Sequence, residues 1–240
     1  MMTPQELYKE INSFGKANAN AEILAKTQRF VRGGYMGHGL TTEQITKKIN
    51  EIVKRQDVTL DIILGAAPLC LRNNMLEEIS MIFLMINRFK KDFSHSSFKE
   101  IEKFFSVGID NWIHADILGM YTLPAFMEVG IIKTEDFDEW KISSYKFQRR
   151  CVPVTLIKPM KKEKSAARYR DYIEPLMVDK EREVHQGVGW FLREAWKIEA
   201  KETEDFLLKW KDTAPRLIFQ YACEKMTAAE KARFKKAKKV

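Results

Sequence analysis

The chain has 240 residues, 45% of them apolar, with a formal net charge of +8 and a pI near 9.2. This length and apolar content exclude a disordered chain and allow one substantial core, built either as a large domain or as an extended array. The positive charge favours a polyanionic partner, such as nucleic acid or an anionic membrane.

The cysteines and the apolar stretches indicate the compartment. Cys70, Cys151 and Cys223 are widely spaced and include no C-x-x-C pair, so we expect neither a disulfide framework nor a zinc site. The N-terminus carries acidic residues, and the richest apolar stretch, Met81 to Ile86, is too short to span a bilayer. We therefore expect a soluble cytoplasmic protein without a membrane-spanning segment.

Helical periodicity dominates the chain, and no alternating strand pattern or Asn-Gly hairpin signal occurs. We expect an all-α protein in which two capping boxes, Thr41 with Gln44 and Thr227 with Glu230, begin helices. The turns are too short for an interdomain linker, so we expect a single domain over 1–240, either a bundle or a stack of helical hairpins. The predicted helices cover residues 4–13, 17–30, 42–55, 58–71, 74–91, 97–106, 111–122, 143–158, 168–178, 183–197, 199–211, 214–226 and 228–238, with turns at 33–39, 72–74, 94–97 and 158–162.

The glycine-rich turn at 33–39, GGYMGHG, precedes a predicted helix, where glycines can cradle a phosphate. It lacks both a preceding strand and a Gly-Lys-Ser/Thr ending, which favours a simple turn over a nucleotide-binding loop. We expect His38 to be exposed on this turn. No histidines have a zinc-ligand spacing such as H-E-x-x-H.

Trp112 and Asp116 are the most informative pair of residues. In the predicted helix 111–122 they lie four residues apart and project within roughly 40° of each other. The rest of this helix is mostly apolar, so a lone carboxylate on it needs a partner or a task. A carboxylate beside an indole suits a cationic ligand or transition state. His114 lies about 160° from Asp116, which favours a structural or surface role.

Two further helices carry candidate residues. In 143–158 an apolar stripe is bordered by Arg150, whereas Arg149 points nearly opposite and is expected to be solvated. In 183–197 Trp190 falls on the side opposite the apolar stripe, where it either packs on a neighbouring helix or faces a ligand. The two stripes consist of Phe147, Cys151 and Val154, and of Val184, Val188, Phe191, Leu192 and Ala195.

Positive charge is concentrated in 158–170 and in 231–240, where six of ten residues are Lys or Arg. We interpret the second segment, within a basic C-terminal tail at about 228–240, as a solvated terminal helix. The first segment is the better candidate for phosphate contacts. Together with Arg149, the predicted DNA-binding residues are Lys158, Lys161, Lys162, Lys164, Arg168 and Arg170.

Asp116, Arg150 and Trp190 follow one another at intervals of 34 and 40 residues, the repeat length of HEAT-like helical pairs. In a stack of such repeats, equivalent positions line up along one concave face. We therefore expect a carboxylate, a guanidinium and two indoles to converge on one groove.

With these residues the chain resembles the AlkD-like DNA alkylation repair family of HEAT-like-repeat alkylpurine DNA glycosylases. The segments that carry the resemblance are NWIHAD, FQRRCVPV and VHQGVGWFLREAWK, within roughly residues 20–226. Trp112 and Asp116 match the family's Trp-x-x-x-Asp, Trp190 its second tryptophan, and Arg150 its active-site arginine. The chain departs from the family at Ile113, which is commonly acidic, and at Asn111, which is usually aromatic.

The resemblance implies a HEAT-like helical solenoid that acts as a monomer on duplex DNA containing alkylated purines. It implies hydrolysis of the N-glycosidic bond of N3- or N7-alkylated purines, with Asp116, Trp112, Trp190 and Arg150 as catalytic residues. No metal or organic cofactor enters this scheme. Two alternatives stay open: a non-catalytic relative that binds DNA structures, and a protein-binding helical solenoid.

Overall fold

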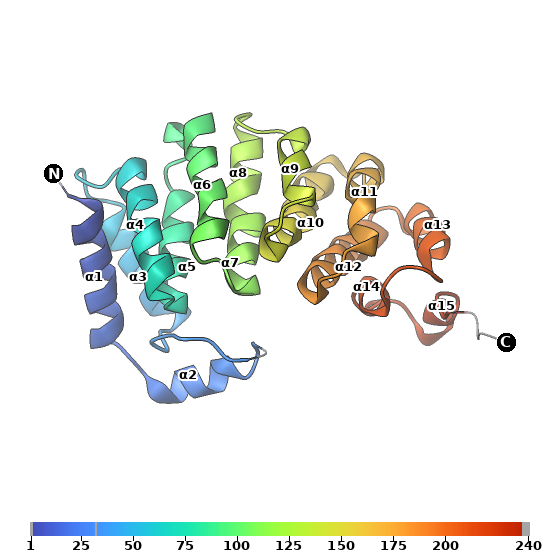
Figure 1. The fold of residues 1–240 in the computed structure, drawn as a ribbon, viewed down its shortest axis with the longest axis horizontal. Helices are drawn as coiled ribbons and strands as arrows, with labels where there is room; N and C mark the ends of the chain where they lie inside the picture. Colours follow the sequence, from blue (N-terminus) through green and yellow to red (C-terminus); the bar gives the residue numbers. More distant parts are fainter. Residues whose placement is uncertain (1, 32, 237–240) are drawn as a thin grey trace. The chain divides into compact units, whose positions relative to one another are not determined.

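The computed structural model describes residues 2–31 and 33–236, and every regular element in these ranges is helical, as predicted. The chain divides into two compact units (Figure 1). The first unit ends at Ile117 and also includes Val129–Ile131, and the second comprises Leu118–Glu128 and the chain from Ile132 onward. Within the described ranges, no helix is both long and apolar enough to cross a bilayer. A single domain over 1–240 stays a prediction.

The first unit is centred on α4 and α5, which are apolar on almost every face. The centre includes Ile63, Ala67, Ile82 and Phe83, all fully buried. Helix α4 packs against α1, α5 and α6, while α5 packs against α3 and α7. The elements are α1 (Pro4–Ala17), α2 (Ala21–Gln28), α3 (Thr42–Ile52), α4 (Leu60–Asn73), α5 (Leu76–Ile86), η1 (Lys90–Asp92), α6 (His95–Val107) and α7 (Trp112–Ile117).

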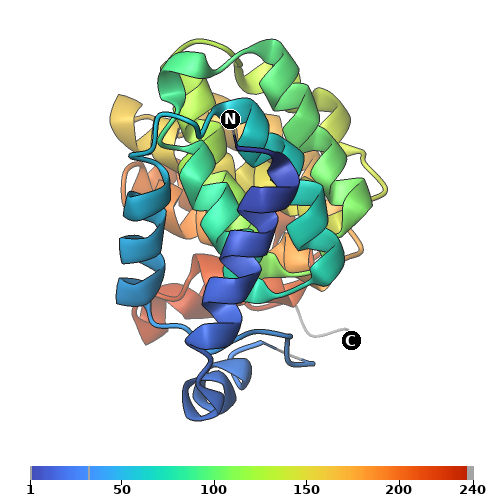
Figure 2. The same ribbon diagram turned by 90° about the vertical axis from the view of Figure 1, so that its left-hand side faces the viewer.

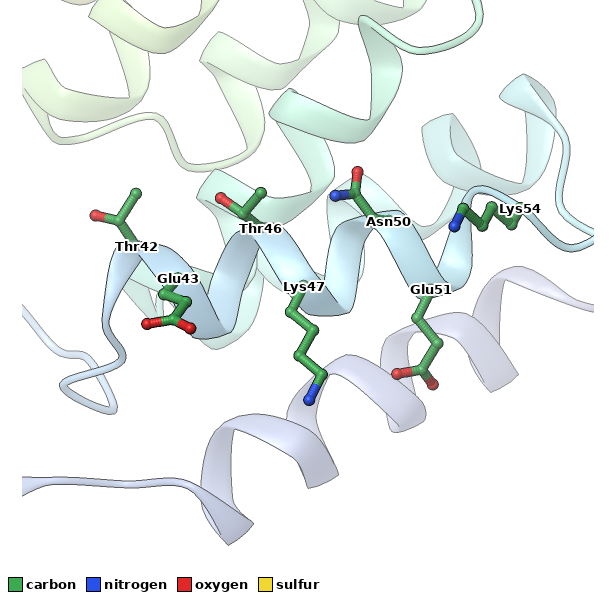
Figure 3. Close-up of a pocket in the computed structure, with 7 residues that line it drawn as sticks. All are labelled: Thr42, Glu43, Thr46, Lys47, Asn50, Glu51 and Lys54. Carbon is green, nitrogen blue, oxygen red and sulfur yellow. The ribbon is translucent and has the colours of Figure 1, made fainter.

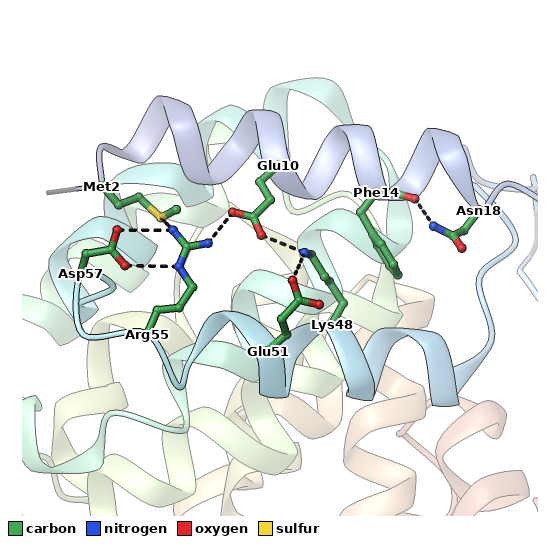
Figure 4. Close-up of polar contacts among 8 residues, drawn as sticks. All are labelled: Met2, Glu10, Phe14, Asn18, Lys48, Glu51, Arg55 and Asp57. Carbon is green, nitrogen blue, oxygen red and sulfur yellow. Dashed lines mark hydrogen bonds and ion pairs between the residues drawn. The ribbon is translucent and has the colours of Figure 1, made fainter.

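Ion pairs fasten α1 to α3 and to the turn after it (Figure 4). Glu10 on α1 accepts from Lys48 and from Arg55, each at 2.8 Å. Lys48 also pairs with Glu51 at 2.7 Å, and Arg55 with Asp57 at 3.2 Å. The predicted capping box of Thr41 and Gln44 begins α3, so the start of this helix is confirmed.

Helix α2 is the least packed helix of the first unit, and it contributes no buried residue. Figure 2 shows it beyond the lower end of α1. It begins after Asn20, whose side chain accepts from the Ile23 N–H at 3.0 Å, and it ends at Gln28. The helix is therefore shorter than the predicted 17–30.

The glycine-rich turn is bound by a carboxylate of the protein itself. Glu77 on α5 accepts backbone N–H groups from His38 at 2.9 Å, from Gly39 at 2.8 Å and from Leu40 at 3.3 Å. The expectation that His38 is exposed is wrong: it is 6% exposed, and its Nε2 lies 2.8 Å from Glu78 Oε1. Because Glu77 takes the N–H groups that would hold a phosphate, the turn is structural.

The second unit is built around α10, α12 and α14, with α12 packed between the other two. Both predicted stripes, on α10 and on α12, are buried. The elements are η2 (Leu118–Thr122), α8 (Leu123–Glu128), η3 (Thr134–Phe137), α9 (Asp138–Lys141), α10 (Lys146–Glu163), α11 (Ala167–Ile173), η4 (Glu174–Val178), α12 (Arg182–Trp196), α13 (Ala200–Trp210), α14 (Arg216–Ala222) and α15 (Ala228–Ala232).

The turn predicted at 158–162 is wrong, because α10 continues to Glu163. Pro153 and Pro159 each remove one helical hydrogen bond. Burial of the surrounding side chains, including the fully buried Met160, offsets this loss. The helix ends instead at Glu163, because the next residue, Lys164, has the left-handed backbone conformation with φ 54°.

The C-terminal segment is anchored more firmly than a solvated terminal helix. Thr227 and Glu230 form the predicted capping box of α15. Phe234 is 1% exposed, and its carbonyl accepts a hydrogen bond from Arg216 at 2.7 Å. The predicted helix over 228–238 is wrong in its end, since α15 stops at Ala232, and residues 237–240 lie outside the described residues.

Candidate functional site

Helix α7 presents the candidate pair Trp112 and Asp116. Asn111 caps it: its side chain accepts from the Ile113 N–H at 2.9 Å, and its carbonyl accepts from the Ala115 N–H at 3.3 Å. Trp112 and Asp116 are both partly exposed and lie one helical turn apart, whereas Ala115 is buried. Asn111 therefore fixes the start of the helix that carries the pair.

His114 occupies the buried side of α7 and has a structural role, one of the two predicted for it. It is 1% exposed, its Nε2 lies 3.3 Å from the Leu76 carbonyl on α5, and its ring meets Phe83 edge-on at 6.2 Å. Burial lowers the pKa of His114 to about 4, although the Leu76 carbonyl acts in the opposite direction. His114 is therefore neutral at pH 7 and packs α7 onto α5.

A π-helical turn, η2, follows α7 in the sequence. Pro124 explains the widened turn, because it has no N–H to donate to the Met120 carbonyl and its ring would crowd that group. The wider turn moves the carbonyl away from the ring without ending the helix. Gly119 within it lies against α10, where an added Cβ would come 2.8 Å from Val154 Cγ1.

Arg149 is not the solvated charge that its position on the helix predicts. It is 7% exposed and forms a two-pronged ion pair with Asp179, with Nε–Oδ2 at 2.6 Å and the second guanidinium nitrogen 3.2 Å from Oδ1. Its remaining nitrogen donates to the Ser143 carbonyl at 2.6 Å. The helical stripe placed Arg149 opposite the core, but a neighbouring loop covers that side.

Arg150 is 5% exposed and lies against α12. It donates to the Glu183 carbonyl at 2.7 Å. Gly187 on α12 leaves space for its stem, because an added Cβ there would lie 3.2 Å from Arg150 Cγ. Its guanidinium is thus held at the first turn of α12.

Trp190 is partly exposed on α12, off the buried stripe as predicted. The preceding Gly189 lets α12 approach α14 closely: an added Cβ would lie 2.5 Å from Tyr221 Cβ and 2.7 Å from the Ile218 carbonyl oxygen. Gln186 donates to the Tyr221 hydroxyl at 2.7 Å, which joins the same two helices. The backbone that carries Trp190 is therefore fixed by its packing on α14.

The basic residues of 158–170 divide into engaged and unengaged groups. Lys161 pairs with Glu194 at 2.5 Å, Arg168 with Glu163 at 2.5 Å, and Arg170 lies 3.6 Å from Glu199. Three exposed lysines make no ion pair with a carboxylate among the described residues, and these are Lys158, Lys162 and Lys164. These three are the cations of the segment with the greatest freedom to meet a phosphate.

Glu194 is a buried carboxylate that the sequence analysis did not single out. Burial raises its pKa, but hydrogen bonds and charge from Lys161 and Lys197 outweigh burial, and the pKa falls to about 2. The missed partners Asp179, Glu183 and Glu194 share one property. Each contacts a residue of α10 that lies 30 or more positions away, namely Arg149, Arg150 and Lys161, so helical periodicity carries no signal for these contacts.

A surface hollow of about 680 Å³ lies along α3 (Figure 3). It is open and lined by side chains of that helix, including Lys47, and by Lys54 just beyond its end. None of the candidate residues lines it. Among the described residues, no three His, Cys, Asp or Glu side chains gather as a metal site.

The family model for DNA alkylation repair enzymes matches residues 16–226. The chain belongs to this family. A search of the curated proteins finds no match. Among solved structures, a predicted DNA alkylation repair enzyme from Enterococcus faecalis is similar, with a TM-score of 0.71 and 13% identity over 88% of this chain and 98% of that chain. This likeness confirms the expected fold class.

The candidate residues are distributed over both units of this DNA alkylation repair family member. Trp112 and Asp116 belong to the first unit, and Arg150 and Trp190 to the second. Within the second unit, Arg150 on α10 and the first turn of α12 are in contact. The convergence of all four residues on one groove stays a prediction.

Proposed function

We propose that the protein is a DNA glycosylase that hydrolyses the N-glycosidic bond of N3- or N7-alkylated purines in duplex DNA and leaves an abasic site. The observation that carries this proposal is the pair of Trp112 and Asp116, partly exposed one turn apart on α7, in a member of the DNA alkylation repair family. A protein that only binds phosphates gains nothing from a carboxylate at such a position.

Hydrolysis of this N-glycosidic bond can use a carboxylate and needs no general acid. An N3- or N7-alkylated purine already carries a positive charge, so it leaves as a neutral base when the bond electrons pass to its nitrogen. The deoxyribose becomes cationic as the bond breaks, and Asp116 stabilises that charge. The oxygen of water then bonds to C1′, and its proton passes to Asp116 or to the solvent.

The other proposed catalytic residues support this step. Trp112 and Trp190 offer electron-rich faces to the cationic sugar and base, each contact contributing about 0.5–2 kcal/mol. Arg150 holds a backbone phosphate near the lesion. The unengaged lysines Lys158, Lys162 and Lys164 bind other phosphates without reading the base sequence.

The test is to incubate the purified protein with a duplex that carries one N7-methylguanine or N3-methyladenine and to measure the released base by chromatography. We expect release from the modified duplex, with an alkali-sensitive site left in the strand, and none from an unmodified duplex. Salt-dependent binding without release would favour the non-catalytic DNA-binding alternative. Absence of both would favour a protein-binding solenoid.

A further inference from the structure

The first turn of α10 is joined to the segment between η4 and α12 by a buried ion pair that the proposed chemistry does not use. The side chains of Arg149 and Asp179 are 8% and 7% exposed, and two nitrogens of the guanidinium face the two oxygens of the carboxylate. The third guanidinium nitrogen donates to the Ser143 carbonyl. We name this pair the Arg149–Asp179 clasp.

Asp179 also organises the chain that leads into α12. Its Oδ1 accepts the Glu181 N–H at 2.8 Å, and its carbonyl accepts from His185 Nε2 at 2.5 Å. The side chain of Asp179 therefore contacts α10 and the N-cap residue of α12, and its backbone carbonyl contacts α12 itself. Moving Asp179 would move the first turn of α12 relative to α10.

The position of Arg150 depends on that first turn. Its guanidinium donates to the Glu183 carbonyl at 2.7 Å, and its stem lies in the space left by Gly187. Arg149 and Arg150 are consecutive residues of one helix, so the register set by the clasp also sets the register of Arg150 against α12. Lys146 and Glu183 form a more exposed pair at 3.0 Å in the same region.

We propose that Asp179 is a positioning residue that holds Arg150 in place through the Arg149–Asp179 clasp. The proposal rests on the phosphate-binding role given to Arg150 under the proposed function. A two-pronged pair between a guanidinium and a carboxylate fixes orientation as well as distance. Apolar packing would hold the two helices together without specifying this geometry.

The test is a double-mutant cycle of Asp179→Asn and Arg150→Ala, which measures single-turnover base release and the Kd for duplex DNA. Asp179→Asn alone should slow release on the order of tenfold, because a catalytic group is displaced rather than removed. In the Arg150→Ala background the same change should have no further effect on release or on the Kd. A role limited to stability predicts equal effects in both backgrounds.

Glu204→Gln is the matched control, because Glu204 also pairs with an arginine, Arg233, and accepts from Trp196 Nε1 at 3.0 Å, within the same unit. It should leave release unchanged. Thermal unfolding followed by circular dichroism checks each variant. If Asp179→Asn does not fold, Arg149→Lys keeps the charge but removes the two-pronged geometry, and it should show the same dependence on Arg150.

The positioning role would be overturned if Asp179→Asn had the same effect in the wild-type and Arg150→Ala backgrounds. It would also be overturned if neither Asp179→Asn nor Arg149→Lys had an effect. If the wild-type protein releases no base but binds the duplex, the proposed function fails. The Kd values of the double-mutant cycle then still decide the role of Asp179. If the wild-type protein neither releases base nor binds the duplex, both proposals fail.

Discussion

Trp112 and Asp116 owe their positions to neighbours that do no chemistry. Asn111 begins the helix with a side-chain hydrogen bond, and His114 attaches it to α5 from the buried side. The pair therefore stands on a short helix whose start and orientation are both fixed. Preorganisation of this kind is what electrostatic stabilisation of a developing charge requires.

At the scale of single residues, we predict that Trp112→Ala and Trp190→Ala each slow single-turnover base release by about 2- to 30-fold, the equivalent of 0.5–2 kcal/mol. Each indole is proposed to supply one of two faces to the cationic sugar and base, so neither loss should remove all of the stabilisation. Trp196→Phe, which removes only the indole donor to Glu204, serves as the control and should not change release. Unchanged release in both test variants would exclude the indoles from the chemistry.

At the scale of the element, α12 is fixed by glycines on two faces. Gly187 gives space to Arg150 on α10, and Gly189 gives space to Tyr221 and Ile218 on α14. The contact at Gly189 is the tighter one, because an added Cβ would lie 2.5 Å from Tyr221 Cβ and 2.7 Å from the Ile218 carbonyl oxygen, whereas at Gly187 the nearest atoms, Cγ and the carbonyl oxygen of Arg150, lie at 3.2 and 3.3 Å.

We predict that Gly189→Ala lowers the free energy of unfolding by about 2–3 kcal/mol through overpacking. Helix propensity alone would predict a gain of about 1 kcal/mol for the same change, so the sign separates the two effects. Gly187→Ala should cost less, since Arg150 Cγ can shift by a few tenths of an ångström. Urea unfolding of both variants measures the difference, and a stabilised Gly189→Ala would contradict the close packing of α12 on α14.

The contact between α7 and α5 should depend on pH through His114. Its pKa in the folded protein is about 4, below the ordinary value of 6.5, so the unfolded chain takes up a proton that the folded chain does not. The stabilisation is fully present above pH 6.5 and declines as the pH falls toward 4, and the stability lost by pH 4 is about 3 kcal/mol. The free energy of unfolding of wild type minus that of His114→Gln should therefore fall over this range. A constant difference would show that the burial of His114 is not linked to protonation.

The local features of these elements could be predicted from the sequence, but their distant contacts could not. The buried stripes and the capping boxes at Thr41 and Thr227 follow from helical spacing, which is a property of neighbouring residues. The continuation of α10 through Pro159 does not, because it depends on burial against α12. The same limit applies to His38 and Arg149, whose environment is set by residues 30 to 40 positions away.

At the scale of the whole molecule, the net positive charge is the property that would attract the phosphates of a DNA duplex. Ion pairs within the protein already use many of the 41 lysines and arginines, including Lys161 and Arg168 of the basic segment. The contribution to DNA binding should therefore come from the unengaged cations rather than from the whole cluster. The sequence predicts the basic segment as the DNA contact, and the ion pairs distinguish its engaged from its unengaged members.

We predict that Lys158→Glu, Lys162→Glu and Lys164→Glu together weaken duplex binding and reduce the slope of log K against log salt by about 2 to 3, since each phosphate contact contributes about 0.9. The control changes the same charge at exposed lysines on other helices: Lys99→Glu, Lys103→Glu and Lys201→Glu. Fluorescence anisotropy over a salt series measures both. Equal slopes for the two triple variants would place the basic segment outside the DNA contact.

The most direct test of the central claim compares the wild-type protein with Asp116→Asn in single-turnover release of N3-methyladenine or N7-methylguanine from a duplex. Asparagine keeps the shape of the side chain and removes the charge that is proposed to stabilise the cationic sugar. We predict an unchanged circular dichroism spectrum, an unchanged Kd for the duplex, and a loss of release on the order of 10²- to 10³-fold. Equal release by the two proteins would contradict the assignment of Asp116 as the catalytic carboxylate.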